Sequence, residues 1–478
     1  MESVAQAVSR LRELAAAEPL ATLAARFAAA GHELALVGGP VRDAFLGRGV
    51  HDLDLATSAR PDDIIRIIRP VVDAHWDIGR DFGTIGARVG DDTVEITTYR
   101  ADEYDPSSRK PEVAFGDTLE GDLLRRDFTM NALALRLPQL ELVDPTGGFD
   151  HLVAGVLTTP TTPERSFGDD PLRMLRGVRF AAQLGVTMDE AVLHAIAAMR
   201  GRLEIVSAER IRDELVKMLA TDAPRRGFEL LVATGLAELV LPELPALRLE
   251  IDEHAHHKDV YEHSLTVLDQ AIELERARGS EEAPADVTLR LAALLHDIGK
   301  PATRKIEQNG AVTFHHHDVV GAKLAKKRLT ALRFDKDTIT AVCRLIELHL
   351  RFFGYADAPW TDSGVRRYVR DAGPYLERLH ILTRADVTTR NRRKAARLKS
   401  AYDELEQRIA ALAEQEELAA IRPDLDGEQI MAILGLRPGP DVGAAYRFLL
   451  ELRLDEGPLG AEEAESRLRA WWGERSSA

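Results

Sequence analysis

Cysteine is almost absent from this sequence, since Cys343 is the only one among 478 residues. A single cysteine excludes a framework of disulfides and a zinc site built from cysteines. Uninterrupted apolar runs are also short, and none approaches the roughly 20 residues that a membrane-spanning helix needs. The N-terminus lacks the pattern of a signal peptide. We therefore expect a cytoplasmic protein with no membrane partner.

Aromatic residues and net positive charge are scarce as well. Aromatics make up 5% of the chain, and together with frequent alanine and leucine this composition favours a largely helical protein. The 62 basic residues against 78 acidic ones give a net charge of −16, which argues against a protein that binds nucleic acid over its whole surface. A local basic groove is compatible with this balance, because binding depends on where the charges cluster.

The first functional pattern begins with an apolar run, LALV, that predicts a buried strand. Gly38 and Gly39 follow, and paired glycines let the backbone approach a phosphate closely. Arg42 adds a cation in the helix expected next. Alternation in the segment HDLDL then places Asp52 and Asp54 on one face of a second strand. Two carboxylates in this arrangement are suited to binding Mg²⁺.

This segment, GGPVRDAFLGRGVHDLD, resembles the signature of the nucleotidyltransferase superfamily to which class II CCA-adding enzymes and bacterial poly(A) polymerases belong. The resemblance implies a mixed-sheet head of the polymerase β type, in which Asp52 and Asp54 hold catalytic Mg²⁺. Glu95, in the alternating segment TVEIT, matches a third catalytic carboxylate; the alternative is a solvent-exposed strand glutamate. A polar loop at residues 100–110 resembles the family's loop for nucleotide selection, which favours full CCA addition over CC addition alone.

A second pattern, RRDFTMNA, starts at Arg125. Neighbouring arginines suit phosphate oxygens because each guanidinium can donate two parallel hydrogen bonds, although such a run is commonly a helix start with surface charge. Here it matches the family's second motif, which implies that Arg125, Arg126, Asp127 and Asn131 bind the nucleotide. The turn DPTGG resembles the family's link between head and neck. His151 stands where the family has aspartate, and we assign no role to it.

A third pattern, DDPLRMLRGVRF, places Asp170 and Arg173 on one face of a predicted helix. Cytosine and adenine both present an amino donor beside a ring-nitrogen acceptor, and a carboxylate with a guanidinium offers the complementary groups. One such template accepts CTP and ATP and rejects GTP and UTP; the alternative is a salt bridge within the helix. The pattern resembles the family's EDxxR motif, with Asp169 in place of glutamate. We include Arg176 and Arg179 in the nucleotide-binding set.

Histidines gather in the second half of the chain, and their order resembles the ligand set of the HD phosphohydrolase superfamily. The resemblance implies phosphodiesterase or phosphatase activity, with an RNA 2′,3′-cyclic phosphate as one candidate substrate. Mixed imidazole and carboxylate ligands suit Mn²⁺, Ni²⁺, Co²⁺ or Fe²⁺, and Mg²⁺ is a further candidate. His256, His257, His315 and His316 are alternates. The expected ligands are His263, His296, Asp297, His317, His349 and Asp386.

These patterns predict a multidomain protein with an α/β head and an all-α remainder. We expect a nucleotidyltransferase head at residues 1–158 and a helical neck with the base template at 159–248. A helical HD domain at 249–400 and a small helical tail at 401–478 complete the chain. The basic run at residues 390–399 is a candidate contact to RNA backbone.

Three functions fit the sequence. The first is a tRNA nucleotidyltransferase that adds CCA from CTP and ATP, by attack of the RNA 3′-hydroxyl on the α-phosphate at a two-Mg²⁺ site. The second, a poly(A) polymerase, shares the head motifs, but the acidic balance and the lack of a long basic tail favour tRNA. In the third, the HD domain carries the main activity and the head is a nucleotide-binding module. The oligomeric state is not predicted.

Overall fold

The computed structural model describes residues 4–50, 53–77, 79–101, 115–248, 259–280, 283–352, 355, 360–389, 391–416 and 422–476. The chain divides into two compact units, Met1–Pro242 and Glu243–Ala478. Among the described helices, none is long and apolar enough to cross a membrane.

A seven-stranded mixed sheet with the strand order β3-β4-β5-β2-β1-β6-β7 forms the centre of the head in the first unit. Its strands are β1 (Leu34–Val37), β2 (Leu53–Thr57), β3 (Ala74–Trp76), β4 (Thr84–Val89), β5 (Asp92–Thr98), β6 (Ala134–Leu137) and β7 (Glu141–Val143). The helices of the head are α1 (Val4–Ala16), α2 (Leu20–Ala29), α3 (Gly39–Phe45), α4 (Pro61–Ile68), α5 (Leu119–Leu124) and α6 (Gly148–Ala154). The mixed-sheet head is therefore confirmed.

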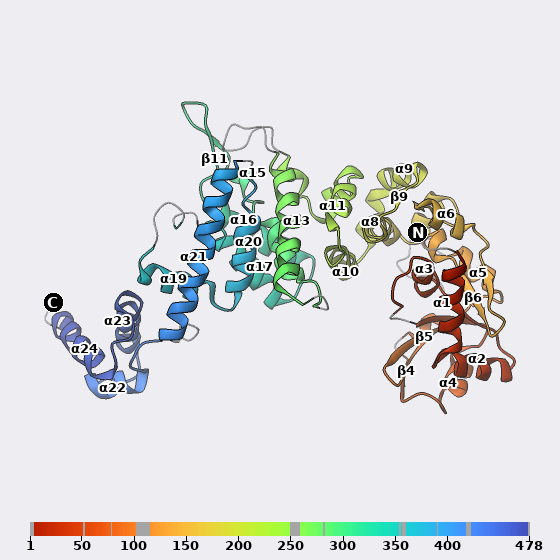
Figure 1. The fold of residues 1–478 in the computed structure, drawn as a ribbon, viewed down its shortest axis with the longest axis horizontal. Helices are drawn as coiled ribbons and strands as arrows, with labels where there is room; N and C mark the ends of the chain where they lie inside the picture. Colours follow the sequence, from red (N-terminus) through yellow and green to blue (C-terminus); the bar gives the residue numbers. More distant parts are fainter. Residues whose placement is uncertain are drawn as a thin grey trace. The chain divides into compact units, whose positions relative to one another are not determined.

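Strands β2 and β5 pair in parallel at the middle of this sheet, whereas their other neighbours pair antiparallel. Alternation gives the two faces of the sheet different chemistry. On β5 the apolar Val94 and Ile96 are fully buried, while Glu95 between them is exposed. Helices α2 and α4 cover the apolar face, where Phe27 and Ile64 are also fully buried (Figure 1). The opposite face carries polar side chains over β2, β5 and β4.

Helices follow the head within the first unit, as expected for the neck. They are α7 (Pro163–Asp169), α8 (Leu172–Leu184), α9 (Glu190–Met199), α10 (Ala208–Leu219), α11 (Pro224–Ala233) and α12 (Ala237–Val240). Helix α8 begins directly after Pro171, and the side chain of Ser207 caps α10 by accepting a hydrogen bond from the Arg210 amide. Helix α8 packs against α10 and α11, so the third sequence pattern lies at the centre of the neck.

The second unit is mostly helical and contains the HD region. Its helices before the tail are α13 (Val260–Arg278), α14 (Val287–Leu295), α15 (Lys300–Thr303), α16 (His317–Ala331), α17 (Lys336–Leu348), α19 (Asp362–Ala372), α20 (Leu376–Ala385) and α21 (Arg392–Glu416). Helices α13, α14, α17 and α20 pack on one another and supply about half of the buried leucines of this unit. The fourfold domain division predicted from the sequence stays a prediction.

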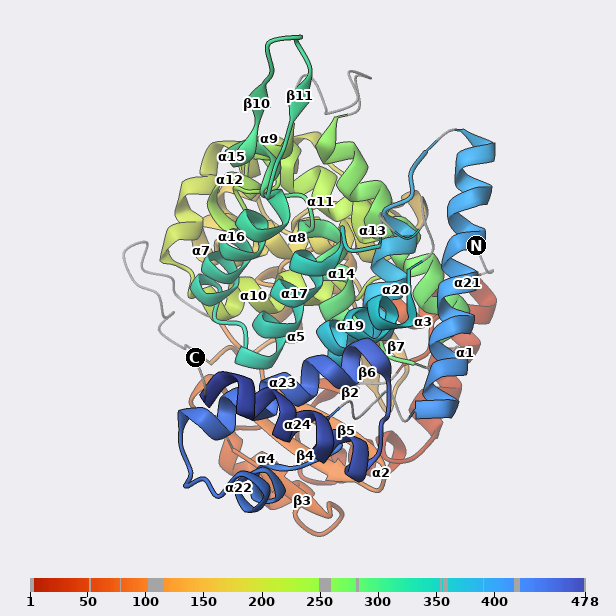
Figure 2. The same cartoon turned by 90° about the vertical axis from the view of Figure 1, so that its left-hand side faces the viewer.

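Two short two-stranded sheets lie outside the main sheet of the head, and three of their four strands fall in the remainder predicted to be all α. β8 (Val156–Leu157), at the end of the predicted head, pairs in parallel with β9 (Thr187–Met188) of the neck. β10 (Lys305–Ile306) and β11 (Val312–Thr313) form a hairpin in the second unit. Gly310, with φ of 80°, supplies the left-handed residue of its turn. Figure 2 shows this hairpin standing out from α15 and α16.

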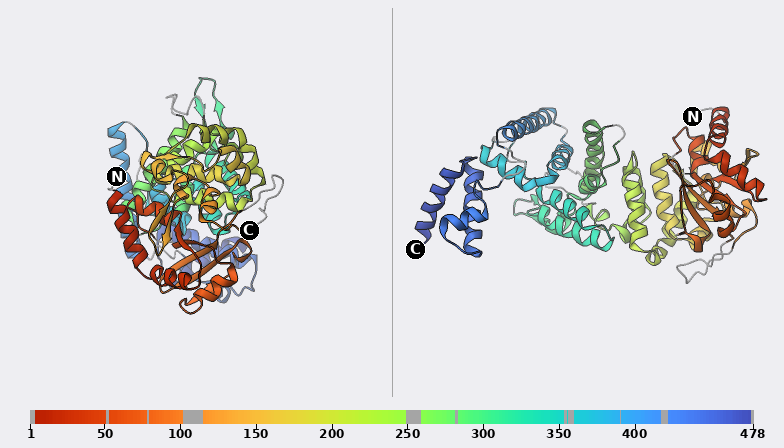
Figure 3. Two further views of the ribbon diagram at one scale, coloured as in Figure 1. Left: turned by 90° about the vertical axis from the view of Figure 1, so that its right-hand side faces the viewer. Right: turned by 90° about the horizontal axis from the view of Figure 1, so that it is seen from below.

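Three helices close the chain, as the sequence predicted for the tail. They are α22 (Gly427–Leu434), α23 (Pro440–Glu456) and α24 (Ala461–Ser476). Figure 3 shows them in dark blue, and their buried side chains include Ile430, Leu449 and Leu468. Helix α23 also meets α19 of the same unit, where the Arg366 guanidinium donates to the backbone carbonyl of Leu454 at 3.1 Å. The tail is thus attached to the HD region by packing and by a buried guanidinium.

Replacement of Gly148 by alanine tests how tightly the start of α6 packs against the backbone of Thr129. A Cβ at this position would lie 2.0 Å from the carbonyl oxygen of Thr129, which belongs to the backbone and cannot rotate away. We expect Gly148→Ala to destabilise the head by about 1–3 kcal/mol, as overpacking does, measured by hydrogen exchange of head amides. Gly201→Ala is the matched control, because nothing lies within 4 Å of its Cβ. Equal protection in both variants would contradict the tight packing.

Candidate functional site

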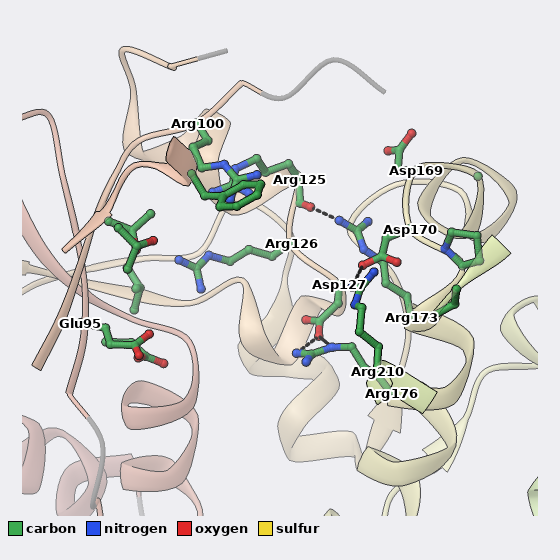
Figure 4. A pocket seen from close by; sticks show the side chains of 18 of the residues that line it. Glu95, Arg100, Arg125, Arg126, Asp127, Asp169, Asp170, Arg173, Arg176 and Arg210 are labelled. Atoms are coloured by element: carbon green, nitrogen blue, oxygen red, sulfur yellow. Dashed lines mark hydrogen bonds and ion pairs between the residues drawn. The ribbon is translucent and has the colours of Figure 1, made fainter. Parts of the chain in front are cut away.

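A cavity of about 730 Å³ opens over the polar face of the head sheet and reaches the neck helices. Its charged lining residues are Asp54, Glu95, Arg100, Arg125, Arg126, Asp127, Asp169, Asp170, Arg173, Arg176, Arg202 and Arg210. Figure 4 shows Glu95 on one side, Asp169, Asp170 and Arg173 on the other, and the side chain of Arg126 pointing between them. The cavity therefore brings together all three sequence patterns of the first unit.

Two carboxylates lie side by side on the sheet wall of this cavity. The parallel register of β2 and β5 pairs Asp54 directly with Glu95, so their side chains emerge on the same face. Both line the cavity. Asp52 lies outside the described residues. Glu95, which the sequence alone left open between a catalytic carboxylate and a surface residue, thus stands next to Asp54.

The glycine turn after β1 allows an arginine to approach the backbone. Gly38 has φ of 72°, a conformation that favours glycine. A Cβ on Gly38 would lie 3.0 Å from Nη1 of Arg126. Gly39 then starts α3. The turn therefore keeps space for the guanidinium of Arg126 beside the sheet.

Asp122 holds the two neighbouring arginines of the second pattern. Its carboxylate accepts hydrogen bonds from Arg125 at 2.6 Å and from Arg126 at 3.2 Å. The Asp122 side chain is 1% exposed, and its burial alone would raise its pKa. The two guanidinium groups outweigh this and hold the pKa of Asp122 below its usual range. Asp122 therefore orients both cations toward the cavity, and no pattern in the sequence had singled it out.

Asp127 joins the head to the neck. Its buried carboxylate accepts hydrogen bonds from Arg176 of α8 at 2.6 and 2.8 Å and from Asn131 at 3.0 Å. Burial alone would raise the pKa of Asp127, but the charge of Arg176 and the donated hydrogen bonds hold it well below its usual range. Asp127 and Asn131 thus form a network that is already complete without a nucleotide.

The third pattern places Asp170 and Arg173 on the neck wall of the cavity. Arg173 is 7% exposed and donates to the Ser166 hydroxyl at 2.9 Å and to the carbonyl of Arg125 at 2.6 Å. Asp170 accepts from Arg210 of α10 at 2.9 Å. The guanidinium and the carboxylate are therefore each held by other groups. Ser166 and Arg210 were missed as site residues because their partners are 7 and 40 residues away.

Two arginines of the predicted nucleotide-binding set are not among the residues that line the cavity. Arg42 is buried and donates to Asn131 at 2.6 Å and to Asp43 at 2.8 Å. Arg179 is buried in the neck, where it donates to Glu214 at 2.6 Å, and burial lowers its pKa. Both side chains lie against the ring of Phe180. These contacts connect head and neck beneath the cavity.

A second site lies in the HD region, where the predicted ligands come together as two groups of three. The first group comprises His263, His296 and Asp386, and the second comprises Asp297, His317 and His349. Within each group the ligand atoms lie within 4.8 Å of one another. The two groups adjoin, because Nε2 of His296 is 3.3 Å from the carboxylate of Asp297.

Backbone carbonyls set the orientation of three of these histidines. Nδ1 of His296, His317 and His349 lies 2.9, 2.8 and 2.6 Å from a carbonyl oxygen three residues earlier. A carbonyl only accepts, so each Nδ1 carries a proton and each Nε2 faces the centre of the cluster. Nε2 of His349 is buried without a hydrogen-bond partner. Such a set of nitrogen and oxygen donors fits a divalent cation.

Neighbouring charges shift the pKa values of the histidines in this cluster in opposite directions. Burial alone would lower the pKa of His296, but the adjacent Asp297 raises it to about 10. Burial and the charge of His296 lower the pKa of His349 to about 4. Lys300 lies 2.8 Å from Asp297. Of the alternates, His315 and His316 are exposed whereas His317 is buried, and His256 and His257 lie outside the described residues.

Comparisons with known proteins show the family of this chain. Three family models match: the poly A polymerase head domain at residues 34–158, the RNA and SrmB-binding site of polymerase A at 185–247, and the HD domain at 260–391. An A-adding tRNA nucleotidyltransferase of Deinococcus radiodurans is 37% identical over 74% of this chain and 79% of its own length. A CC-adding tRNA nucleotidyltransferase of Thermus thermophilus is 32% identical over 92% of this chain and 94% of its own length.

A solved structure shares the fold. The crystal structure of the Bacillus stearothermophilus CCA-adding enzyme in complex with CTP superposes with a TM-score of 0.69 at 23% identity, and the match covers 95% of this chain and 97% of that one. The chain therefore belongs to the tRNA nucleotidyltransferase and poly(A) polymerase family. It is a nucleotidyltransferase with an HD domain, and the family resemblance and fold class predicted from the sequence are confirmed.

The Asp127→Asn variant tests the link between head and neck. It removes the nearer of two acidic partners of Arg176, since Glu214 lies 3.8 Å away, and we expect a loss of about 3 kcal/mol in unfolding free energy at pH 7. Because the folded-state pKa of Asp127 is depressed, its stabilising effect is present above the unfolded-state pKa of about 4 and is lost as the pH falls further. The stability difference between variant and wild type should therefore be constant from pH 7 to 5 and shrink below pH 4. Urea unfolding measures this, and a difference that vanishes already at pH 6 would contradict it.

Proposed function

We propose that this chain adds CCA to the 3′ ends of tRNA, with CTP and ATP as substrates. The observation that carries the proposal is the cavity in which Asp54 and Glu95 face Asp170 and Arg173, with arginines between them. The sheet side provides acidic groups for phosphoryl transfer, and the neck side provides a donor and acceptor pair for a base. The relatives named above are tRNA enzymes, which supports tRNA over poly(A) as the product.

The acidic wall fits magnesium. Asp54 and Glu95 offer hard oxygen donors from directly paired positions on two strands. Together with Asp52 they are our candidates for holding two Mg²⁺ ions. Bound Mg²⁺ would assist deprotonation of the RNA 3′-hydroxyl and offset negative charge on the triphosphate. Asp54 and Glu95 would hold these ions at the sheet, where the attacking hydroxyl and the α-phosphate have to meet.

The arginines are assigned to the triphosphate. Arg125 and Arg126 are held by the buried Asp122 and line the cavity between its two walls. Fixed guanidinium groups suit phosphate oxygens, since they are oriented before the ligand arrives. Arg42 and Arg179 take a supporting role in this proposal, because both are engaged beneath the cavity.

Base selection is assigned to Asp170 and Arg173. Cytosine and adenine share the order of amino donor and ring-nitrogen acceptor that this pair complements, so one protein template serves both nucleotides. Arg173 is fixed by Ser166 and by the Arg125 carbonyl, which defines the direction of its N–H groups. Uracil and guanine present the reverse order and leave buried polar groups unpaired, which is costly.

Sequencing of the products tests the proposal. The substrate is a tRNA transcript that ends before its CCA, offered with CTP alone, ATP alone and both. We expect two C residues with CTP alone and a completed CCA with both nucleotides. A single A only on a transcript that already ends in CC would indicate an A-adding enzyme. Addition that stops at CC would indicate a CC-adding enzyme, and a long A tract a poly(A) polymerase.

The carboxylates of the sheet wall give the second test. We expect Asp54→Ala to lower the incorporation rate by at least 10³-fold, since it removes a donor to the catalytic metal. Asp91→Ala, which removes an exposed carboxylate in the turn between β4 and β5, is the matched control and should keep wild-type activity. Retained incorporation in Asp54→Ala would rule out the assignment of the site.

A second activity is proposed for the HD site. The two adjoining groups of three ligands suit two divalent cations of the Mn²⁺, Ni²⁺, Co²⁺, Fe²⁺ or Mg²⁺ kind, and the unpartnered Nε2 of His349 favours a cation over a purely structural cluster. A pair of metal ions is suited to hydrolysis of phosphoesters, and RNA 2′,3′-cyclic phosphate is our candidate substrate.

Metal analysis of the full chain tests this second activity. We expect bound divalent cations after dialysis against MnCl₂, and at least a tenfold loss of Mn²⁺ affinity in His349→Ala. His315→Ala, at an exposed histidine, is the control and should keep wild-type affinity. Equal Mn²⁺ content in the two variants would refute the site, and absence of cyclic-phosphate cleavage with metal bound would refute the hydrolase assignment alone.

A further inference from the structure

An exposed tryptophan lies in the same row of the head sheet as the two carboxylates. The registers of three successive strand pairs align Trp76 with Gly86, Gly86 with Glu95, and Glu95 with Asp54. Side chains at directly paired positions point to the same face of a sheet. Trp76 on the edge strand β3 therefore shares the face of the cavity carboxylates.

Gly86 leaves room for the indole ring of Trp76. A Cβ on this glycine would lie 2.0 Å from Nε1 of Trp76 and 2.2 Å from Cε2. The indole thus lies across β4, in the space that any other residue at position 86 would fill. This arrangement directs the ring along the sheet surface, between the outer edge and Glu95.

The tryptophan is open to solvent although it belongs to the site face. Its exposed fraction is 36%, and Phe82, which lines the cavity, is 42% exposed. Large aromatic side chains are usually well buried, so exposed ones beside a site favour a ligand that covers them. Arg88, on the same face of β4, is exposed as well and would accompany a polyanion.

The proposed transfer reaction determines which ligand fits there. The nucleoside triphosphate is assigned to the arginines and the Asp170–Arg173 template on the neck side of the carboxylates (Figure 4). The RNA end must then reach Asp54 and Glu95 from another direction. The Cα atoms of Trp76 and Glu95 are two strand spacings apart, roughly 10 Å, which is within the reach of one nucleotide.

We propose that Trp76 is a stacking platform for the 3′-terminal base of the acceptor RNA. The inference rests on the proposed function of the head. During CCA addition the terminal base of the RNA changes at each step, while the same 3′-hydroxyl position must be kept. Stacking on an indole accepts any base, because every base has a π face, whereas hydrogen bonds to base edges would discriminate.

Kinetics of three variants test the role of the indole. Trp76→Ala should raise the KM for tRNA by about 5- to 100-fold, with the KM for CTP and ATP unchanged. Trp76→Phe keeps an aromatic face and should restore most of the tRNA affinity. His75→Ala is the control, because His75 is exposed on the same strand and points to the opposite face; it should behave as wild type.

Fluorescence gives a readout that a purely structural role would not change. The fluorescence of a 2-aminopurine placed as the terminal base of the tRNA should be quenched when the tRNA binds to wild type or to His75→Ala. It should not be quenched when the tRNA binds to Trp76→Ala. Unchanged quenching in Trp76→Ala, or an equal rise of the KM for nucleotide and RNA, would overturn the inference. If wild type adds no nucleotide at all, the proposed function fails instead, which separates the two outcomes.

Discussion

The ion pair between Asp127 and Arg176 is the contact on which the geometry of the first unit depends. Asp127 follows the two arginines of the head, and Arg176 lies on α8, one turn after Arg173. Their bond therefore fixes the distance between the acidic sheet wall and the Asp170–Arg173 pair on the neck. Arg42 and Asn131 extend the same network to the start of α3. Because the carboxylate is buried, the network cannot exchange its partners for water without a large cost.

The cavity of the first unit is rich in positive charge, although the chain as a whole is acidic. The chain carries a net charge of −16, yet seven arginines line one cavity. Four of these arginines are held by acids: Asp122 holds Arg125 and Arg126, Asp127 holds Arg176, and Asp170 holds Arg210. The arginines are therefore oriented at a tolerable electrostatic cost before a polyanion enters. An acidic surface elsewhere would limit unspecific binding of nucleic acid.

The features that the sequence predicted well depend on which types of residue lie near one another along the chain. The glycine turn at Gly38, the alternating strand around Glu95 and the order of the HD ligands are of this kind, and the strands, the turn and the HD cluster are found where they were expected. What could not be predicted depends on contacts between distant segments. Arg210 reaches Asp170 over 40 residues, and the inward orientation of Arg179 follows from packing against Glu214. The edge strand β3 is only three residues long and all three residues are exposed to solvent, so no apolar pattern marks it.

The base selection that we propose for the oriented guanidinium of Arg173 can be tested by one ratio of rate constants. The measurement is kcat/KM for CTP divided by that for UTP, in wild type and in Arg173→Lys. Lysine keeps the charge but lacks the planar pair of donors. We expect the ratio to fall at least tenfold in the variant, because a site that hydrogen-bonds its substrate loses discrimination when a donor is lost. An unchanged ratio with a lower overall rate would contradict it, since Arg173 would then serve stability or charge alone.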